Sequence, residues 1–87
     1  MSKTNIQLSD SSTENNPHVF RLEIGESIKQ IREGRGLTQE QLAERMSISR
    51  STISKIESGK FNFSIDYLSK FAQFLRFDLT ISTKELL

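Results

Sequence analysis

The chain has 87 residues, 26% of them charged, and its 12 lysines and arginines nearly balance 11 acidic residues, for a net charge of +1. This length suits one domain with one modest core, and the absence of cysteine excludes disulfides and cysteine-ligated metal sites. Because no apolar run approaches the roughly 18 residues of a membrane span, and the N-terminus lacks signal-peptide features, we expect a protein of the reducing cytoplasm with no membrane partner.

Residues 1–17 are rich in serine, threonine and asparagine, with Ile6 and Leu8 as their sizeable apolar side chains. Such a segment buries too little apolar area to offset the entropy lost on ordering, so we expect a flexible polar N-terminal tail. A DNA-reading arm is the alternative, but such arms carry several basic residues and Lys3 is alone here.

Residues 18–76 have the periodicity of helices packed around one core. A first helix is expected over about Arg21 to Glu33, and Gly34 and Gly36 end it because glycine adopts the left-handed conformation without a Cβ clash. The apolar residues of this helix recur at steps of three and four, which places them on one stripe: Phe20, Ile24, Ile28 and Ile31.

Two short helices follow, joined by a turn at about residues 47–49. Thr38 and Gln41 form the T-x-x-Q pattern of a capping box that begins the second helix. Ser49 is a good N-cap for the third helix, and Gly59 ends it. The inward positions of the two helices are apolar: Leu42, Ala43, Met46, Ile48, Ile53 and Ile56.

Ser64 caps a fourth helix over about Ile65 to Leu75, and Phe74 lies off its apolar stripe. Residues 77–87 then change to the alternating period of a half-buried strand, which must find a partner for its backbone groups. The positions expected to face inward on the fourth helix are Ile65, Leu68, Phe71, Ala72 and Leu75, and those on the strand are Phe77, Leu79 and Ile81.

The third helix leaves a polar and basic outer face, made of Arg50, Ser51, Ser54 and Lys55. The small Ala43 lets the second and third helices cross closely, so this face is free to meet another molecule. Between Arg50 and Lys60 the chain has three basic residues and one acid, Glu57. A face of this kind, on a helix that the major groove can accept, is typical of DNA readers.

The segment 24–76 resembles the phage-repressor (Cro-like, Xre) helix-turn-helix family. The fold that this implies is all-α, a compact four- to five-helix lambda-repressor-like domain, here with a C-terminal β-strand. The residues that carry the resemblance are Arg32, Leu37-Thr38-Gln39, Leu42-Ala43, Ile48-Ser49, Thr52-Ile53-Ser54 and Ile56-Glu57-Ser58-Gly59-Lys60.

The resemblance implies a role for particular positions. Gln39 would touch a phosphate and brace the third helix, and Arg50 would read a guanine in the major groove. Arg32 and Glu57 would form a structural ion pair that ties the first helix to the third. The full set of implied DNA-binding residues is Thr38, Gln39, Ser49, Arg50, Ser51, Thr52, Ser54, Lys55, Lys60 and Asn62.

Two positions depart from the family pattern. Ser47 stands where the turn usually has glycine, so it must tolerate or avoid a positive φ. Phe63 stands where many members have proline, and with Phe61 it leaves two aromatic residues beside the expected DNA face. These aromatics either complete the core or face a partner.

Residues suited to catalysis or metal binding are scarce. His18 is the one histidine, and a metal site needs more ligands than it offers. Gly34 and Gly36 do not form a phosphate-binding loop, because no strand precedes them and Gln39 follows. We therefore expect neither an enzyme nor a cofactor.

A single helix in one major groove discriminates weakly, since each good base contact is worth about 1–3 kcal/mol. We therefore expect a homodimer that reads two half-sites, in which the strand at 77–87 pairs with its copy and buries Phe77, Leu79 and Ile81. Phe74 would join this interface. The competing idea is that the strand pairs with residues 18–22 of the same chain.

The function expected is a transcriptional regulator, most simply a repressor, that binds double-stranded DNA as a homodimer. The alternative is an antitoxin that neutralises a toxin protein by binding it and also represses its own operon, because a short helix-turn-helix chain ending in a strand resembles such antitoxins. A pure protein-interaction module is a third reading, which Gln39, Arg50 and Lys55 argue against.

Overall fold

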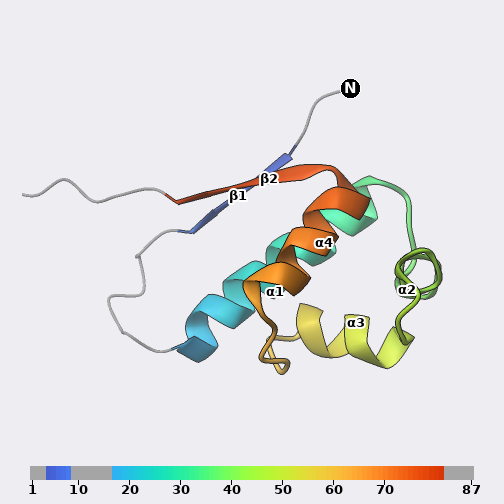
Figure 1. Cartoon of the computed structure of the whole chain (residues 1–87), viewed down its shortest axis with the longest axis horizontal. Coiled ribbons are helices and arrows are strands. Elements are labelled where there is room, and N and C mark those ends of the chain that lie inside the picture. The colour runs from blue at the N-terminus through green and yellow to red at the C-terminus, as the bar shows by residue number, and fades with distance from the viewer. Residues whose placement is uncertain (1–3, 9–16, 82–87) are drawn as a thin grey trace, which may run out of the picture.

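The computed structural model describes residues 4–8 and 17–81 and consists mostly of helix (Figure 1). Four helices form the body, and a two-stranded sheet lies over one side of it. In chain order the elements are β1 (Thr4–Leu8), α1 (Pro17–Gly34), α2 (Gln39–Met46), α3 (Arg50–Glu57), α4 (Ile65–Leu75) and β2 (Phe77–Ile81).

Side-chain caps begin three of the four helices, as the sequence predicts. The Thr38 hydroxyl accepts from the Gln41 backbone N–H at 3.0 Å, and the Gln41 side chain accepts from the Thr38 N–H at 2.9 Å. Ser49 and Ser64 each accept from a backbone N–H three residues on, at 3.1 Å. Each such cap stabilises its helix by about 1 kcal/mol.

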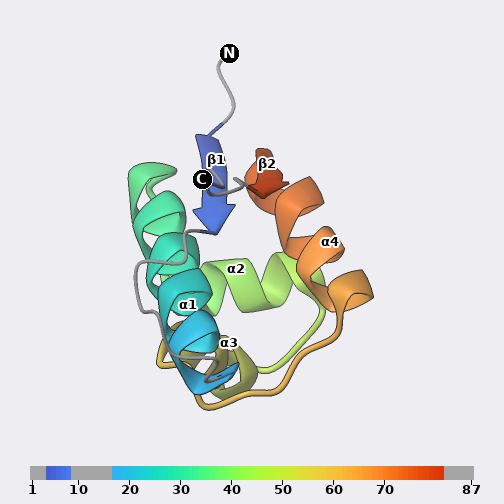
Figure 2. The same ribbon diagram turned by 90° about the vertical axis from the view of Figure 1, so that its left-hand side faces the viewer.

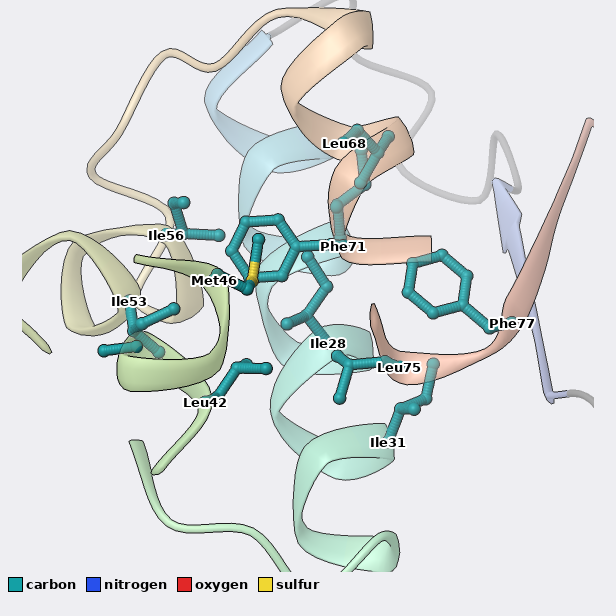
Figure 3. Packing of buried hydrophobic residues seen from close by; sticks show 12 residues of the cluster. Ile28, Ile31, Leu42, Met46, Ile53, Ile56, Leu68, Phe71, Leu75 and Phe77 are labelled. Atoms are coloured by element: carbon teal, nitrogen blue, oxygen red, sulfur yellow. The ribbon is translucent and has the colours of Figure 1, made fainter. Parts of the chain in front are cut away.

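One apolar core lies where the four helices and the first residue of β2 meet (Figure 3). Phe71 stands near its centre, 1% exposed, and each large side chain buried there contributes roughly 1.5–3 kcal/mol of transfer free energy. The other members are Ile24, Ile28, Ile31, Leu42, Ala43, Met46, Ile53, Ile56, Leu68, Leu75 and Phe77.

Phe61 and Phe63, which the sequence leaves unplaced, pack against this core as partly buried residues. The Phe61 ring lies 5.9 Å from the Tyr67 ring, and Tyr67 in turn meets Phe71 edge-on at 5.9 Å. The loop between α3 and α4 is therefore held by aromatic packing.

Helix α1 lies against α3 closely enough to require glycine at one point of contact. A Cβ built on the buried Gly25 would lie 2.3 Å from the carbonyl oxygen of Ile56 and 2.8 Å from that of Glu57. Both obstacles are backbone atoms, so they cannot rotate away. Gly25 thus sets the distance between α1 and the helix that carries the expected DNA face.

The sheet pairs the two ends of the described chain. Strands β1 and β2 run parallel, with Thr4 opposite Phe77 and Leu8 opposite Ile81. Figure 2 shows β1 on the α1 side and β2 on the α4 side, so the sheet lies across one side of these two helices. The strand predicted at the C-terminus is present, and its partner lies at the N-terminus of the same chain.

Two expectations about the chain ends need correction, and a third lies partly outside the described residues. Residues 4–8 form a strand instead of belonging to an unstructured tail, because β2 supplies the hydrogen-bond partners that the segment lacks by itself. The pairing of β2 with residues 18–22 is wrong, since those residues are part of α1. The expected strand continues to residue 87, but residues 82–87 lie outside the described part of the chain.

Helix α1 begins at Pro17 instead of near Arg21, and proline suits a first turn because the N–H it lacks has no helical partner there. Gly34 is the last residue of α1, and the left-handed turn falls on Gly36, with φ of 75°. Ile65 was expected in the core, but this prediction is wrong: it is the first residue of α4 and is 73% exposed. Within residues 4–8 and 17–81, no helix has the length and apolar character needed to cross a membrane.

Candidate nucleic-acid interface

Helix α3 has two contrasting faces. Its inner face buries Ile53, Ile56 and Glu57. Its outer face presents Arg50, Ser51, Ser54 and Lys55, all of them exposed. The basic and hydroxyl side chains that the sequence singles out thus share one accessible surface, at the side of the molecule opposite the sheet (Figures 1 and 2).

Three of the expected DNA-binding residues take part in helix caps. The Ser49 hydroxyl lies 2.8 Å from the Thr52 hydroxyl and accepts from the Thr52 N–H, so both side chains belong to the N-cap of α3. Thr38 has the same role at α2. These hydroxyls sit at helix N-termini, where backbone dipoles favour a nearby anion such as a phosphate.

A buried ion pair joins α1 to α3. The Arg32 Nε donates to Glu57 Oε2 at 2.6 Å, and the second terminal nitrogen of Arg32 donates to Oε1 at 3.1 Å. The remaining nitrogen donates to the Leu37 carbonyl at 2.6 Å, which fixes the turn before α2. The hydrogen bond to Glu57, with its negative charge, raises the pKa of Arg32 above its ordinary value, so this side chain stays protonated.

Gln39 completes this network at the first residue of α2. Its amide Nε2 donates to Glu57 Oε1 at 3.0 Å, so one side chain of α2 is held by the same carboxylate that Arg32 binds. Glu57 therefore holds α1, α2 and α3 together around the reading face, which is the outer face of α3 made of Arg50, Ser51, Ser54 and Lys55. The second hydrogen of the Gln39 amide stays available to an acceptor from outside, as phosphate contact requires.

Gln39 and Ser54 line a hollow between α1 and α3, and Lys29 of α1 lies on its rim. Lys29 was not expected here, because its position on α1 shows no periodic signal that separates it from any solvated lysine. Its place beside two expected contact residues adds a basic group to the interface.

Arg50 lines a second hollow, together with Thr38 and two acidic residues, Glu40 and Glu44. These two carboxylates were also not expected beside the DNA face. They lower the positive potential next to Arg50, so the reading face is less uniformly basic than α3 alone suggests.

Lys60 and Asn62 follow α3 in the loop that leads to α4, and both are exposed. The Lys60 backbone N–H donates to the Lys55 carbonyl at 2.8 Å, which fixes the chain as it leaves α3. Asn62 instead lies beside Phe63 on an apolar groove near the N-terminus of α1. The structure therefore places Lys60 with the α3 face and sets Asn62 at the edge of a different surface.

The turn between α2 and α3 does contain the left-handed residue that the family pattern requires. Ser47 adopts φ of 58° and ψ of 42°, and the Ile48 N–H donates back to the Ala43 carbonyl at 3.0 Å. This is the geometry of a glycine-terminated helix formed by serine. Serine at position 47 thus adopts the left-handed conformation that glycine usually supplies, at a cost in strain.

The four residues expected at a dimer interface do not share one surface. Phe77 is 3% exposed and belongs to the core of its own chain. Leu79 and Ile81 are 36% and 76% exposed and line the apolar groove with Ile65. Phe74 is 46% exposed, but its position on the α4 helical wheel is opposite the residues that border β2.

Arg35 is a second structural arginine, with no signal in the sequence pattern. Its Nε donates to the Leu75 carbonyl at 2.9 Å, and a terminal nitrogen donates to the Arg76 carbonyl at 2.9 Å. These are carbonyls that the end of α4 leaves without a helical partner. Arg35 therefore ties the end of α1 to the junction of α4 and β2.

Two curated proteins are similar in sequence to part of this chain. A transcriptional activator of Enterococcus faecalis, BcrR, is 45% identical over 60 residues, which make up 69% of this chain and 28% of that protein. An immunity repressor of Bacillus phage phi105 is 45% identical over 49 residues, 56% of this chain and 34% of the repressor. The chain thus spans about a third or less of these relatives.

Solved structures give the same picture of the fold. The restriction-modification controller protein C.AhdI of Aeromonas hydrophila superposes with a TM-score of 0.65 at 28% identity, over 69% of this chain and 91% of that one. The controller C.Esp1396I, solved as a tetramer with its natural 35-base-pair operator, has a TM-score of 0.61 at 33% identity, over 67% of this chain and 76% of its own.

The family model described as helix-turn-helix matches residues 28–81, which include α2, α3, α4 and β2. This range holds the buried ion pair, the turn at Ser47 and the exposed face of α3. The chain therefore belongs to the helix-turn-helix family.

Proposed function

We propose that this chain is a sequence-specific DNA-binding regulator that inserts α3 into the major groove of double-stranded DNA. One observation carries the proposal. The outer face of α3 combines exposed Arg50 and Lys55 with small hydroxyl residues, while the opposite face is locked to α1 and α2 through Glu57. A rigid helix with a free basic face can present donors to base edges at fixed positions.

Within this proposal Arg50 reads a guanine, Lys55 and Ser51 reach into the groove, and Gln39, Thr52 and Lys60 contact the backbone. Thr38 and Ser49 contribute through the helix N-termini that they cap, and Ser54 lines the same hollow as Lys29. Asn62 is the weakest member of the set, since it borders the apolar groove.

We propose that the chain represses transcription by occupying its site. The relatives include an activator and a phage repressor, and the operator-bound controller supports DNA as the partner. Occupation of DNA by itself blocks other proteins, whereas activation needs a further surface that recruits them. The same relatives support a regulatory role.

A homodimer is part of the proposal. One α3 helix offers few base contacts at about 1–3 kcal/mol each, and a second reading head on the adjacent half-site multiplies the discrimination. The operator complex of the related controller contains several copies of its chain, which supports assembly on DNA. The antitoxin alternative has no such support from the relatives described above, so a toxin partner is not proposed.

The test is a titration of the full chain against DNA from its own upstream region, at two salt concentrations. We expect a defined site whose affinity falls steeply with salt, because Lys and Arg release counterions from phosphates. The variant Arg50→Ala with Lys55→Ala should lose its preference for that site. Lys70→Ala removes an exposed lysine of α4, away from the reading face, and serves as the control that leaves the preference unchanged.

Equal affinity of the wild-type chain for its own site and for unrelated DNA would contradict sequence-specific reading. A reporter gene behind the same site then tests the sign of regulation: expression should fall when the chain is present and recover with the double variant. A rise in expression would overturn repression while leaving DNA binding intact.

A further inference from the structure

An apolar groove of about 380 Å³ lies where four parts of the chain meet: the first turns of α1, the loop before α4, the first turn of α4 and the end of β2. Strand β2 runs back along α4 (Figure 1), so Ile81 at its end and Ile65 at the beginning of α4 line the same hollow. Neither Arg50 nor Lys55 lines it. The groove is therefore separate from the reading face.

The groove has a buried apolar base and an exposed apolar rim. Ile24 and Leu68 are 8% and 2% exposed, so they form its base, where it reaches the core. Ile65 and Ile81 are 73% and 76% exposed and form the rim. An apolar ligand that covers these side chains removes their surface from water, which favours binding.

The size of the groove suits a small molecule. Ligand pockets in proteins commonly have volumes of about 300–1,000 Å³. If each non-hydrogen atom needs about 30 Å³, the share of one water in the liquid, the groove holds about a dozen such atoms. An unbranched chain of about ten carbons that ends in a carboxylate has this size, and its flexibility lets it follow a hollow formed by four separate elements.

Arg21 gives the groove a positive charge. It is the one charged residue in the described lining, and within residues 4–8 and 17–81 its side chain makes no hydrogen bond or ion pair. The first turn of α1 has no acidic residue, and Asp66 in the first turn of α4 does not line the groove. The guanidinium of Arg21 is therefore open to an anionic group of a ligand.

The polar groups of the lining favour a carboxylate as this anionic group. The planar fork of arginine matches the two oxygens of a carboxylate, whose single negative charge it neutralises, whereas a phosphate carries nearly two. The Ser64 hydroxyl already accepts from the Tyr67 N–H as the cap of α4. Asn62, exposed at the same groove, can donate from its side-chain amide.

We propose that this groove binds an unbranched aliphatic carboxylate of about ten carbons, a size set by the volume of the groove. The chain covers Ile24 and Leu68, and the carboxylate pairs with Arg21. This ligand site goes beyond the proposed function, since it shares no residue with the reading face. Asn62 also lies two residues after Lys60, so the site adjoins the segment that leaves α3.

Isothermal titration calorimetry of the full chain against saturated carboxylates of increasing length tests the apolar part of the site. The ligands are hexanoate, octanoate, decanoate and tetradecanoate, each below the concentration at which it forms micelles. Affinity should rise about fourfold per methylene up to decanoate, because each of these methylenes is buried. Tetradecanoate should bind little better than decanoate, since its added carbons lie outside the groove.

Arg21→Gln tests the charged part of the site. It should weaken decanoate binding about tenfold or more, because a hydrogen bond between two charged groups is lost. Decanol has the same chain without the charge, so its affinity should be equal for the wild type and Arg21→Gln. Arg45→Gln removes an exposed arginine of α2 outside the groove and should leave decanoate binding unchanged.

Ile81→Ser tests the rim, and it should weaken decanoate and decanol alike by several-fold because it removes apolar surface. Phe74→Ser is its matched control, an exposed apolar residue that does not line the groove, and should bind both ligands like the wild type. Both side chains project into solvent, so circular dichroism should show an unchanged helix content.

Failure of decanoate to bind the wild-type chain would overturn the site. An affinity that keeps rising to tetradecanoate would overturn a groove of limited length, and equal decanoate binding by Arg21→Gln would overturn the assignment of a carboxylate. These measurements use no DNA. A chain that binds decanoate as described but not its upstream region therefore leaves this inference standing and removes the proposed function, and a specific DNA binder without affinity for decanoate does the reverse.

Discussion

Glu57 is the residue through which the reading face is organised, because it accepts hydrogen bonds from both Arg32 and Gln39 while only 7% exposed. A buried ion pair contributes little net stability when whole, but loss of one partner leaves a charge with no compensation. Its main effect is therefore on the arrangement of α1, α2 and α3.

Arg32→Met should lower the free energy of unfolding by about 3–5 kcal/mol, since the Glu57 carboxylate then stays buried without its arginine. The double variant Arg32→Met with Glu57→Leu should recover most of that loss, because no buried charge remains. Urea denaturation followed by circular dichroism measures both. A double variant no more stable than the single one would show that the pair itself stabilises the fold.

Gly25 governs how closely two elements approach. Gly25→Ala should destabilise the fold by about 1–3 kcal/mol, because its Cβ meets the Ile56 carbonyl oxygen and α1 must move away from α3. Gly34→Ala is the control at the other end of α1, where a Cβ meets nothing within 4 Å and alanine favours helix. Thermal unfolding should rank Gly34→Ala at or above the wild type, and equal losses at both sites would contradict the packing argument.

The turn between α2 and α3 stores strain at Ser47, whose φ is 58°. Ser47→Gly should raise the free energy of unfolding by up to about 1 kcal/mol, since relief of the left-handed strain exceeds the added entropy of the unfolded chain. Ser58→Gly, at a cap with φ of −94°, has no such strain to relieve and should be neutral or destabilising. Affinity for DNA should be unchanged by Ser47→Gly, and a loss of stability would show that serine makes a compensating contact.

At the scale of the whole molecule, the helices and their core could be predicted because both depend on local sequence patterns. Thr38, Ser49 and Ser64 cap the helices that the sequence assigns to them, and the buried stripe of α1 contains Ile24, Ile28 and Ile31. The exposed face of α3 follows from the same periodicity. The resemblance further implied the approach of Arg32 to Glu57, which the structure contains.

The long-range features could not be predicted in this way. The segment Thr4–Leu8 reads as a polar tail because its strand is held by backbone hydrogen bonds to a partner at the other end of the chain. Gly25 and Arg35 contact backbone carbonyl groups of helices distant in the sequence. The periodicity of side chains does not show where such carbonyl groups lie. Lys29 joins the interface only because α1 passes beside Gln39.

The pairing of Thr4 with Phe77 has a consequence for the order of folding. It closes nearly the whole described chain into one loop, whose entropic cost must be met before any hydrogen bond of the sheet forms. Contacts within and between neighbouring helices lack this cost and form sooner. Although strand β1 precedes the helices in the chain, it therefore pairs with β2 only after the helices have packed and brought β2 beside it. The helices in the middle of the chain thus fold before the sheet formed by its two ends.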